Sequence, residues 1–448
     1  MRSFRDVQSE PVSQIPSRRP GPSLGRNVAL NLVAQGLPMV AAVVAVPPVL
    51  AALGEARFGV LALAWTLVSF FGLLDLGVGR ALTKLLAERE PGSGDARDLV
   101  GTALALALAL GVVAGVALAL AAPWLVQRVL AVPPELRAEA QRALGLLALA
   151  LPAAVVGVTL RGVLEARQRF DLVTAVRAPM GVAMFAGPLL VVPFSSSLVA
   201  VVAVVVVVRV VALAGYLMAV ARVEPWRTWP SSVHAARILR LGGWMTVSNV
   251  IAPLLLYLDR FVVASIVSLE AVTLYVTPFE VISRLSIIPL AVMGVVFPVF
   301  SRSLAGDPCE AHRLWRRSLV AVAGLLAPPA LAVALLARPL LEMWLGADFA
   351  ARAVAPAAIL AVGMLVHGLT QPSFNLLQAA GRADVTARLH LVEAPLYLGY
   401  MWWLTARFGI VGTACAWLIR VGLSALALTL LAHFLVLNRR PRAAGEPP

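Results

Sequence analysis

The chain has 448 residues, of which 60% are hydrophobic and only 13% are charged, and its mean hydropathy is +0.89. A soluble protein of this length needs a more polar surface, so the composition excludes that class and indicates a membrane protein with several spans. The formal net charge is +14 at pH 7. Because the arginines are scattered between apolar segments, this charge is typical of membrane topology signals and argues against a nucleic-acid partner.

Residues 1–25 are rich in Pro, Ser and Arg, and we expect them to form a disordered cytoplasmic tail. After them, about twelve apolar stretches are each long enough to cross a hydrocarbon core of roughly 30 Å as a helix. Most arginines then fall on the side of the two chain ends, which predicts that both termini are cytoplasmic. The expected fold class is therefore an all-α polytopic membrane protein. We place the spans at 27–51, 58–79, 99–124, 143–162, 173–193, 197–219, 238–260, 269–298, 317–337, 353–378, 387–406 and 410–436.

Similar segments recur in the same order at separations of about 210 to 215 residues, which indicates a duplicated unit of six helices. The segment LEARQRFDLVT at 164–174 matches LQAAGRADVT at 377–386, and Arg209 corresponds to Arg420. Chance similarity between Ala-rich helices is the alternative. Because six is even, the copies would share topology and form two pseudo-symmetric lobes. The predicted division is a tail at 1–25, an N-lobe at 26–221, a cytoplasmic linker at 222–237, a C-lobe at 238–436 and a basic cytoplasmic tail at 437–448.

Several polar side chains lie inside the apolar stretches, where contact with lipid is costly. Asn31 and Gln35 share one face of the first span, and Asp75 lies near the end of the second. An arginine at a helix centre costs roughly 2.5 to 3.5 kcal/mol on insertion. Arg209 and Arg420 lie deepest, so they predict either a substrate cavity or an ion pair that locks helices together.

Charged pairs occur in the two spans that follow the predicted linker. Glu280 and Arg284 are four residues apart on one helix face, where they could contact substrate or form a structural salt bridge. Asp259 and Arg260 end the preceding span, where they could take part in ion coupling or form an interfacial cap. The pattern leaves both alternatives open for each pair.

Other charged residues lie near predicted cytoplasmic ends of spans. Arg26, Arg80 and Arg161 fit the positive-inside rule, and they could also form an entry site for a phosphate group. His390 and Glu393 share one face of their span and offer a titratable pair for coupling transport to protons. A histidine at the membrane interface is the alternative interpretation.

One helix face in the span 353–378 is polar along its length. His367, Gln371, Asn375 and Gln378 follow one another at helical spacing. Their side chains can hydrogen-bond to sugar hydroxyls or to neighbouring helices. The cysteines, Cys309 and Cys415, are too far apart for a metal motif and do not indicate a disulfide framework, so we expect neither a metal nor a cofactor.

The order of these features resembles the polysaccharide flippase branch of the multidrug/oligosaccharidyl-lipid/polysaccharide (MOP) exporter superfamily. The resemblance covers roughly residues 26–436. A neighbouring branch, the lipid II flippases, usually carries two extra helices that this chain has no room for. The residues that carry the resemblance are Arg26-Asn27, Leu53-Gly54-Glu55, Phe58-Gly59, Leu74-Asp75-Leu76-Gly77, Leu258-Asp259-Arg260, Tyr275, Phe297-Pro298 and Ser301.

The resemblance implies two lobes that rock to open a central cavity to either side of a bacterial inner membrane. The implied cargo is an oligosaccharide on a polyprenyl pyrophosphate, the protein is not an enzyme, and its partners are membrane lipids, a coupling proton or sodium ion and the polysaccharide polymerase machinery. A pyrophosphate cannot cross hydrocarbon unaided, and the planar guanidinium fork suits its oxygens. We therefore expect the cavity residues to be Arg209, Arg420, Arg284, Glu280, Arg26, Arg80, Arg161, Asn31, Gln35, Gln371 and Asn375. The expected ion-coupling residues are Asp75, Asp259, His390 and Glu393.

Three alternatives to this function are considered. A drug or small-cation antiporter of the same superfamily should have an acidic, aromatic cavity, whereas the deep charges here are mostly arginines. A lipid II flippase would carry a related headgroup. A membrane-embedded glycan polymerase or ligase usually needs a large external loop, and the longest external segments predicted here, around 125–142 and 338–352, are short.

Overall fold

The structure is a computed structural model, and it describes residues 24–73, 77–130, 132–226, 230–306 and 308–437. Within that part the chain is helical and contains no strand, as expected for the all-α class. The predicted tails at 1–25 and 437–448 lie almost wholly outside the described residues. The α-helices are α1 (Leu24–Leu73), α2 (Val78–Ala87), α3 (Gly94–Trp124), α4 (Pro134–Ala148), α5 (Ala150–Ala166), α6 (Phe170–Val191), α7 (Leu198–Val223), α8 (Ser232–Ile266), α9 (Leu269–Ser283), α10 (Ile287–Gly306), α11 (Pro308–Leu335), α12 (Ala337–Leu345), α13 (Ala347–Ala379) and α14 (Ala383–Ala432). Short segments of other helix types are η1 (Leu125–Val129), η2 (Arg284–Ser286) and η3 (His433–Leu437).

Two of the long helices contain a non-helical residue at which the chain changes direction. Gly54 in α1 has φ +74°, and Gly409 in α14 has φ +58°. Glycine adopts such backbone angles without the steric cost that a side chain would add. Around Gly409 the chain folds back closely, since the hydroxyl groups of Thr405 and Thr413 lie 2.9 Å apart. The turn predicted at Leu53-Gly54-Glu55 is therefore confirmed.

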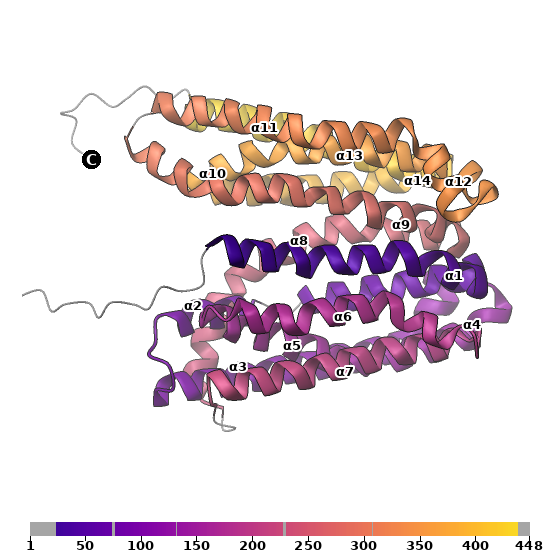
Figure 1. Cartoon of the computed structure of the whole chain (residues 1–448), viewed down its shortest axis with the longest axis horizontal. Coiled ribbons are helices and arrows are strands. Elements are labelled where there is room, and N and C mark those ends of the chain that lie inside the picture. Colours follow the sequence, from indigo (N-terminus) through magenta and orange to yellow (C-terminus); the bar gives the residue numbers. More distant parts are fainter. Residues whose placement is uncertain (1–23, 74–76, 131, 227–229, 307, 438–448) are drawn as a thin grey trace, which may run out of the picture.

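The helices form two groups, which Figure 1 shows one above the other. In the structure we call α1–α7 the N-lobe and α9–α14 the C-lobe, and we describe α8 separately although most of it falls in the C-lobe predicted from the sequence. Helix α8 connects them: near its start, His234 lies 3.2 Å from Asp95 of α3. Near its other end, Asp259 accepts a hydrogen bond from the hydroxyl of Tyr275 in α9 at 2.7 Å. A single helix thus packs against both lobes.

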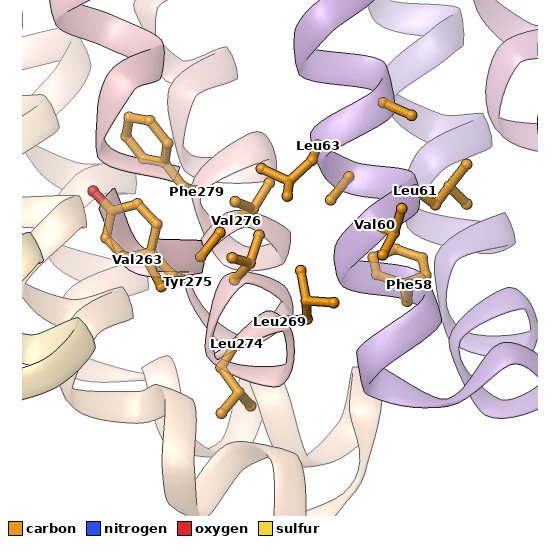
Figure 2. Packing of buried hydrophobic residues seen from close by; sticks show 14 of the residues in the cluster. Phe58, Val60, Leu61, Leu63, Val263, Leu269, Leu274, Tyr275, Val276 and Phe279 are labelled. Carbon is orange, nitrogen blue, oxygen red and sulfur yellow. The ribbon is translucent and has the colours of Figure 1, made fainter. Parts of the chain in front are cut away.

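The lobes contact each other mainly through the second part of α1 and through α9. Figure 2 shows this core, in which Phe58 and Leu63 of α1 lie across from Leu269 and Val276 of α9. The close approach of α1 and α9 depends on Gly59, because a Cβ atom there would lie 2.2 Å from the carbonyl oxygen of Leu269. The main contact between the lobes is therefore apolar and tightly packed.

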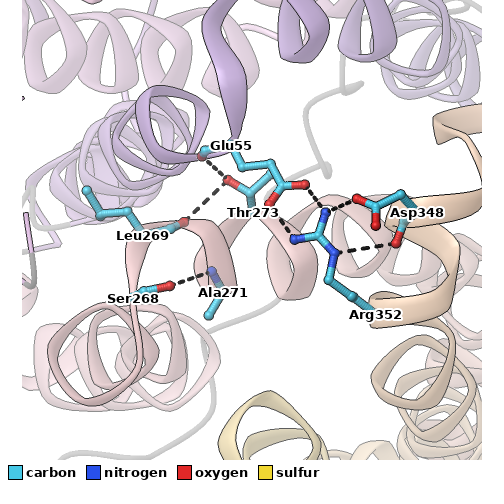
Figure 3. A network of polar contacts seen from close by, with 7 residues as sticks. All are labelled: Glu55, Ser268, Leu269, Ala271, Thr273, Asp348 and Arg352. Atoms are coloured by element: carbon cyan, nitrogen blue, oxygen red, sulfur yellow. Dashed lines mark hydrogen bonds and ion pairs between the residues drawn. The ribbon is translucent and has the colours of Figure 1, made fainter. Parts of the chain in front are cut away.

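Polar contacts join the lobes at the Gly54 end of this core (Figure 3). The hydroxyl of Thr273 in α9 donates a hydrogen bond to the carbonyl oxygen of Glu55 in α1 at 2.7 Å. The carboxylate of Glu55 accepts a hydrogen bond from Nη1 of Arg352 in α13 at 2.8 Å, and Arg352 also binds Asp348. Figure 1 places this end opposite the end at which α1 begins and η3 ends. The lobes are thus held together at one end of the bundle.

The outer surface of the bundle is strongly apolar. Nine helical stretches of the described chain are long and apolar enough to cross a membrane. Large apolar side chains such as Leu120 and Leu190 are 77% and 75% exposed. A soluble surface does not carry such a density of exposed apolar groups, so this is a multi-pass membrane protein. The exact number of crossings stays a prediction.

Candidate functional site: a cationic cavity between the lobes

A cavity of about 300 Å³ lies between the two lobes. Its walls come from α1, α6 and α7 of the N-lobe, from α8, and from α9, η2 and α12 of the C-lobe. Among the lining residues that the structure describes, four are arginines and one is a carboxylate, and the others are apolar or neutral. The charged residues are Arg177, Arg209, Arg260, Arg284 and Glu280.

Arg260 connects the two lobes inside this cavity. Its side chain is buried; Nη1 donates to the hydroxyl of Thr66 in α1 at 2.7 Å, and Nη2 lies 2.7 Å from Glu280 in α9. The guanidinium also lies 5.0 Å from the centre of the Tyr257 ring. Glu280 is shared, because Arg284 approaches its other oxygen at 3.5 Å. One carboxylate therefore serves two of the arginines.

The two arginines on the N-lobe side have no such counter-ion. Among the side chains that the structure describes, no carboxylate lies within 4.0 Å of Arg177 or Arg209. Arg209 approaches the sulfur of Met180 at 3.9 Å, and its buried Nε atom has no hydrogen-bond partner among the described residues. An uncompensated guanidinium is costly away from water, so this wall of the cavity favours a bound anion.

A second, smaller cavity of about 70 Å³ extends the basic wall within the N-lobe. It shares Arg177 and Arg209 with the larger cavity and adds Arg161 of α5 and Tyr216 of α7. Arg161 forms an ion pair with Glu165 at 3.3 Å, one helical turn away. Three arginines from three helices thus line these two neighbouring spaces.

The structure brings together some of the residues predicted from the sequence. Arg209, Glu280 and Arg284 line the large cavity, and Arg161 adjoins it. Arg177 and Arg260 also line it but were not among the expected cavity residues. In the sequence, Arg177 has no feature that separates it from the other arginines near span ends, because its role depends on which way α6 faces.

Arg420 lies apart from this cavity. It is buried within the C-lobe, with its guanidinium 5.2 Å from the centre of the Tyr397 ring and its Nε atom without a hydrogen-bond partner. Arg209 and Arg420, which the predicted repeat aligns, therefore do not meet in one space. Asp259 and Arg260 also differ from the interfacial cap considered for them, since both are buried in the interior.

The remaining predicted residues fall into separate places. Gln371 and Asn375 line a groove between α10 and α13, and Arg80 is exposed on α2. His390 lies 3.1 Å from Glu393, whose other oxygen accepts a hydrogen bond from Ser424 at 2.5 Å. The side chains of Arg26, Asn31, Gln35 and Asp75 lie outside the described residues.

Two solved structures share this architecture. An inward-facing multidrug resistance MATE family transporter of the MOP superfamily matches with a TM-score of 0.73 and 14% identity, over 91% of this chain and 94% of that one. The lipid II flippase MurJ in an inward closed conformation matches with a TM-score of 0.71 and 12% identity, over 90% and 87%. This chain therefore has the same fold as these two proteins.

The sequence itself places the chain more narrowly. A relative from Shigella flexneri named "Putative O-antigen transporter" is 28% identical over 415 residues, which is 91% of this chain and 97% of that protein. Residues 49–356 match the family described as "Polysaccharide biosynthesis protein", and the chain belongs to that family. The resemblance drawn from the scattered motifs is thereby confirmed.

Proposed function

We propose that this protein moves an oligosaccharide linked to a polyprenyl pyrophosphate across the bacterial inner membrane. The observation that carries the proposal is the cavity between the lobes, in which four arginines face one carboxylate. Supporting observations are the family membership and the Shigella flexneri relative, whose name describes a transporter of O-antigen. The protein acts in this proposal as a transporter and not as an enzyme.

The chemistry of the cargo explains the arginines. A pyrophosphate carries negative charge that hydrocarbon does not accept, so its path needs positive groups shielded from lipid. Arg177 and Arg209 offer guanidinium groups that no carboxylate of the described side chains pairs with, and each can pair with two phosphate oxygens. The cargo would then supply the negative charge that the N-lobe wall lacks.

The contacts between the lobes indicate the side of the membrane to which the cavity is closed. The lobes are joined at the Gly54 end by Glu55, Thr273 and Arg352, and this end lies opposite the end at which α1 begins and η3 ends. With both termini in the cytoplasm, the described conformation is closed to the outside. A rocking motion that separates these contacts would release the cargo on the opposite face of the membrane.

The cavity disfavours a cation antiporter. A positive charge about 4 Å from a guanidinium is repelled by roughly 4 kcal/mol at an effective dielectric constant of 20. Glu280 is already bound to Arg260 and does not offer a free acidic site. A lipid II flippase would carry the same kind of pyrophosphate, so the cargo must be distinguished by experiment.

The test uses cells that depend on this protein for surface polysaccharide. Without it, the lipid-linked oligosaccharide should accumulate facing the cytoplasm, and surface polysaccharide should disappear. The wild-type chain should restore export, whereas Arg209→Gln should not, and Arg222→Gln, which changes an exposed arginine of the same helix, should behave as wild type. Accumulation of lipid II instead would identify the other flippase, and full export by the variant Arg177→Gln/Arg209→Gln would contradict the proposal.

Coupling to an ion and association with a polymerase are further parts of this proposal. His390, Glu393 and Ser424 form a contact chain within the C-lobe that could bind a proton or sodium ion. Asp259 is held by Tyr275 near the cavity wall. Movement of such an ion down its gradient would drive the lobes through their cycle.

A further inference from the structure

A second open space lies in the C-lobe and differs chemically from the cationic cavity. It is a groove of about 580 Å³ between α10 and α13, with Ser286 of η2 at one edge. Among the described residues that line it, none is a lysine, arginine or carboxylate. The polar members are Ser286, His367, Gln371 and Asn375, and the aromatic members are Phe297 and Phe374.

The groove adjoins the cationic cavity along one segment of the chain. The short helix η2 contributes Arg284 to the cavity and Ser286, two residues later, to the groove. Helix α9 precedes η2 with the cavity residue Glu280, and α10 follows it with the groove residue Pro289. A molecule that extends along this segment would pass from a cationic to a neutral environment.

The polar groups of the groove retain free hydrogen-bonding capacity. The side-chain nitrogen of Asn375 donates to the backbone oxygen of Gln371 at 2.8 Å, and that of Gln371 lies 3.4 Å from Nε2 of His367. Within the described chain, the side-chain amide oxygens of both residues accept no hydrogen bond. Each oxygen can therefore accept from a ligand hydroxyl.

The uncharged lining and the two unpaired amide oxygens favour one of two candidate occupants of the groove. A polyprenyl chain would cover the amide oxygens without pairing them, which costs free energy for each buried polar group. A sugar presents hydroxyls to the amides and C–H faces to aromatic rings such as Phe374. The absence of charge among the lining residues fits neutral sugar units and does not fit the pyrophosphate.

We infer that the α10–α13 groove holds neutral sugar units of the same cargo whose pyrophosphate occupies the cationic cavity. This inference rests on the proposed function and adds a glycan-binding subsite to it. The two parts of the cargo would then be recognised separately. The cationic cavity would accept any lipid pyrophosphate, and the groove would select the glycan.

Photo-crosslinking in cells tests the inference directly. A benzophenone amino acid replaces Phe374 in the groove, Phe185 in the cavity, or Trp403, which is 57% exposed on the outer surface, as a lipid-facing control. After irradiation, mild acid cleaves the bond between the glycan and the pyrophosphate. We expect the protein crosslinked at position 374 to retain the glycan after this step, because the crosslink is made to sugar.

The outcomes separate the inference from the proposed function. A crosslink at 374 that loses the glycan but keeps a polyprenyl chain would show that the groove holds lipid, and would overturn the inference. Capture of the cargo at 185 with none at 374 would also overturn it while leaving the proposed function standing. No capture of cargo at either position would count against both.

Substitutions in the groove provide a second measurement on the purified full chain. In Gln371→Leu/Asn375→Leu, binding of lipid-linked oligosaccharide extracted from the same cells should weaken about tenfold, as expected for two lost hydrogen bonds. Binding of farnesyl diphosphate, which has no sugar, should stay unchanged. Thr370→Val removes a neighbouring hydroxyl that does not line the groove and should affect neither ligand. Equal weakening for both ligands, or none for the oligosaccharide, would contradict the inference.

Discussion

Arg260 of α8 and Thr66 of α1 are joined by a hydrogen bond of 2.7 Å inside the cavity, so that a residue of the helix between the lobes binds the N-lobe directly. The same guanidinium binds Glu280 of the C-lobe at 2.7 Å. Any motion that separates the lobes must rearrange one of these contacts. The charged residues of the cavity therefore take part in the contacts that hold the lobes together.

Glu280 should limit how tightly the cavity holds an anion. In Glu280→Gln, Arg260 and Arg284 lose their carboxylate partner, so the positive charge of the cavity rises by one unit. We expect farnesyl diphosphate to bind at least about fivefold more tightly because of the added attraction. Export of polysaccharide should slow because release is slower. Glu342→Gln, in the exposed pair with Arg338, is the control, and unchanged binding in Glu280→Gln would contradict the prediction.

The ion pair between Glu55 and Arg352 should bias the bundle toward the described conformation. Removing it in Arg352→Gln takes away one of the polar contacts at this end and leaves the Thr273 bond, so the lobes should separate there more often. Partly exposed ion pairs contribute about 1 kcal/mol or less, so the open population should rise up to about fivefold. The rate at which a cysteine placed at Thr66 reacts with a reagent added outside the cell measures this. Arg338→Gln, in an exposed pair with Glu342, should leave the rate unchanged, and Glu55→Arg/Arg352→Glu should restore it.

Gly59 should tolerate no side chain in the described conformation. A Cβ atom there would lie 2.2 Å from the carbonyl oxygen of Leu269, which belongs to the backbone and has little room to move. Gly59→Ala should therefore lower the thermal stability of the purified protein and increase reaction of the same external reagent. Gly145→Ala adds a Cβ atom in open space on α4 and should be neutral or slightly stabilising. Wild-type behaviour of Gly59→Ala would show that the two helices are not this close.

The buried ion pair between Arg167 and Glu224 should be important for stability. The two side chains are 8% and 0% exposed and lie 2.6 Å apart, and Glu224 also accepts a hydrogen bond from the backbone of Gly92. Breaking a buried pair by removing one partner costs about 3 to 5 kcal/mol. Glu224→Gln should unfold at a clearly lower temperature. Asp171→Asn, which breaks an exposed pair with Arg169, should change stability by about 1 kcal/mol or less.

Glu393 should be needed for coupling if protons drive the cycle. Its carboxylate contacts His390 and Ser424, and Glu393→Gln removes its charge while keeping its shape. We expect transport into vesicles by this variant to stop responding to an imposed pH gradient, whereas the Glu342→Gln variant still responds. If wild-type transport responds to a sodium gradient and not to pH, the coupling ion is sodium. A pH response equal to wild type in Glu393→Gln would remove this residue from the coupling mechanism.

Local patterns predicted the helices and the turns well. The turn at Gly54 follows from a short Leu-Gly-Glu segment between two apolar runs, and the structure has glycine at positive φ there. The pair of Glu280 and Arg284 follows from helical spacing and is present at 3.5 Å. The closer partner of Glu280 is Arg260, which comes from another helix. Spacing along one helix says nothing about such a contact.

The apolar composition and the length of the hydrophobic stretches alone determine that this chain folds as helices in a membrane, because lipid offers no hydrogen bonds to an open backbone. The sequence also shows that several arginines lie where lipid cannot solvate them. Which of those arginines share one cavity was decided only by the packing of the helices. Arg177 and Arg209 face the space between the lobes, whereas Arg420 faces Tyr397 inside one lobe. The rotation of each helix about its own axis decides which way its arginine points. That rotation depends on contacts between residues far apart in the chain.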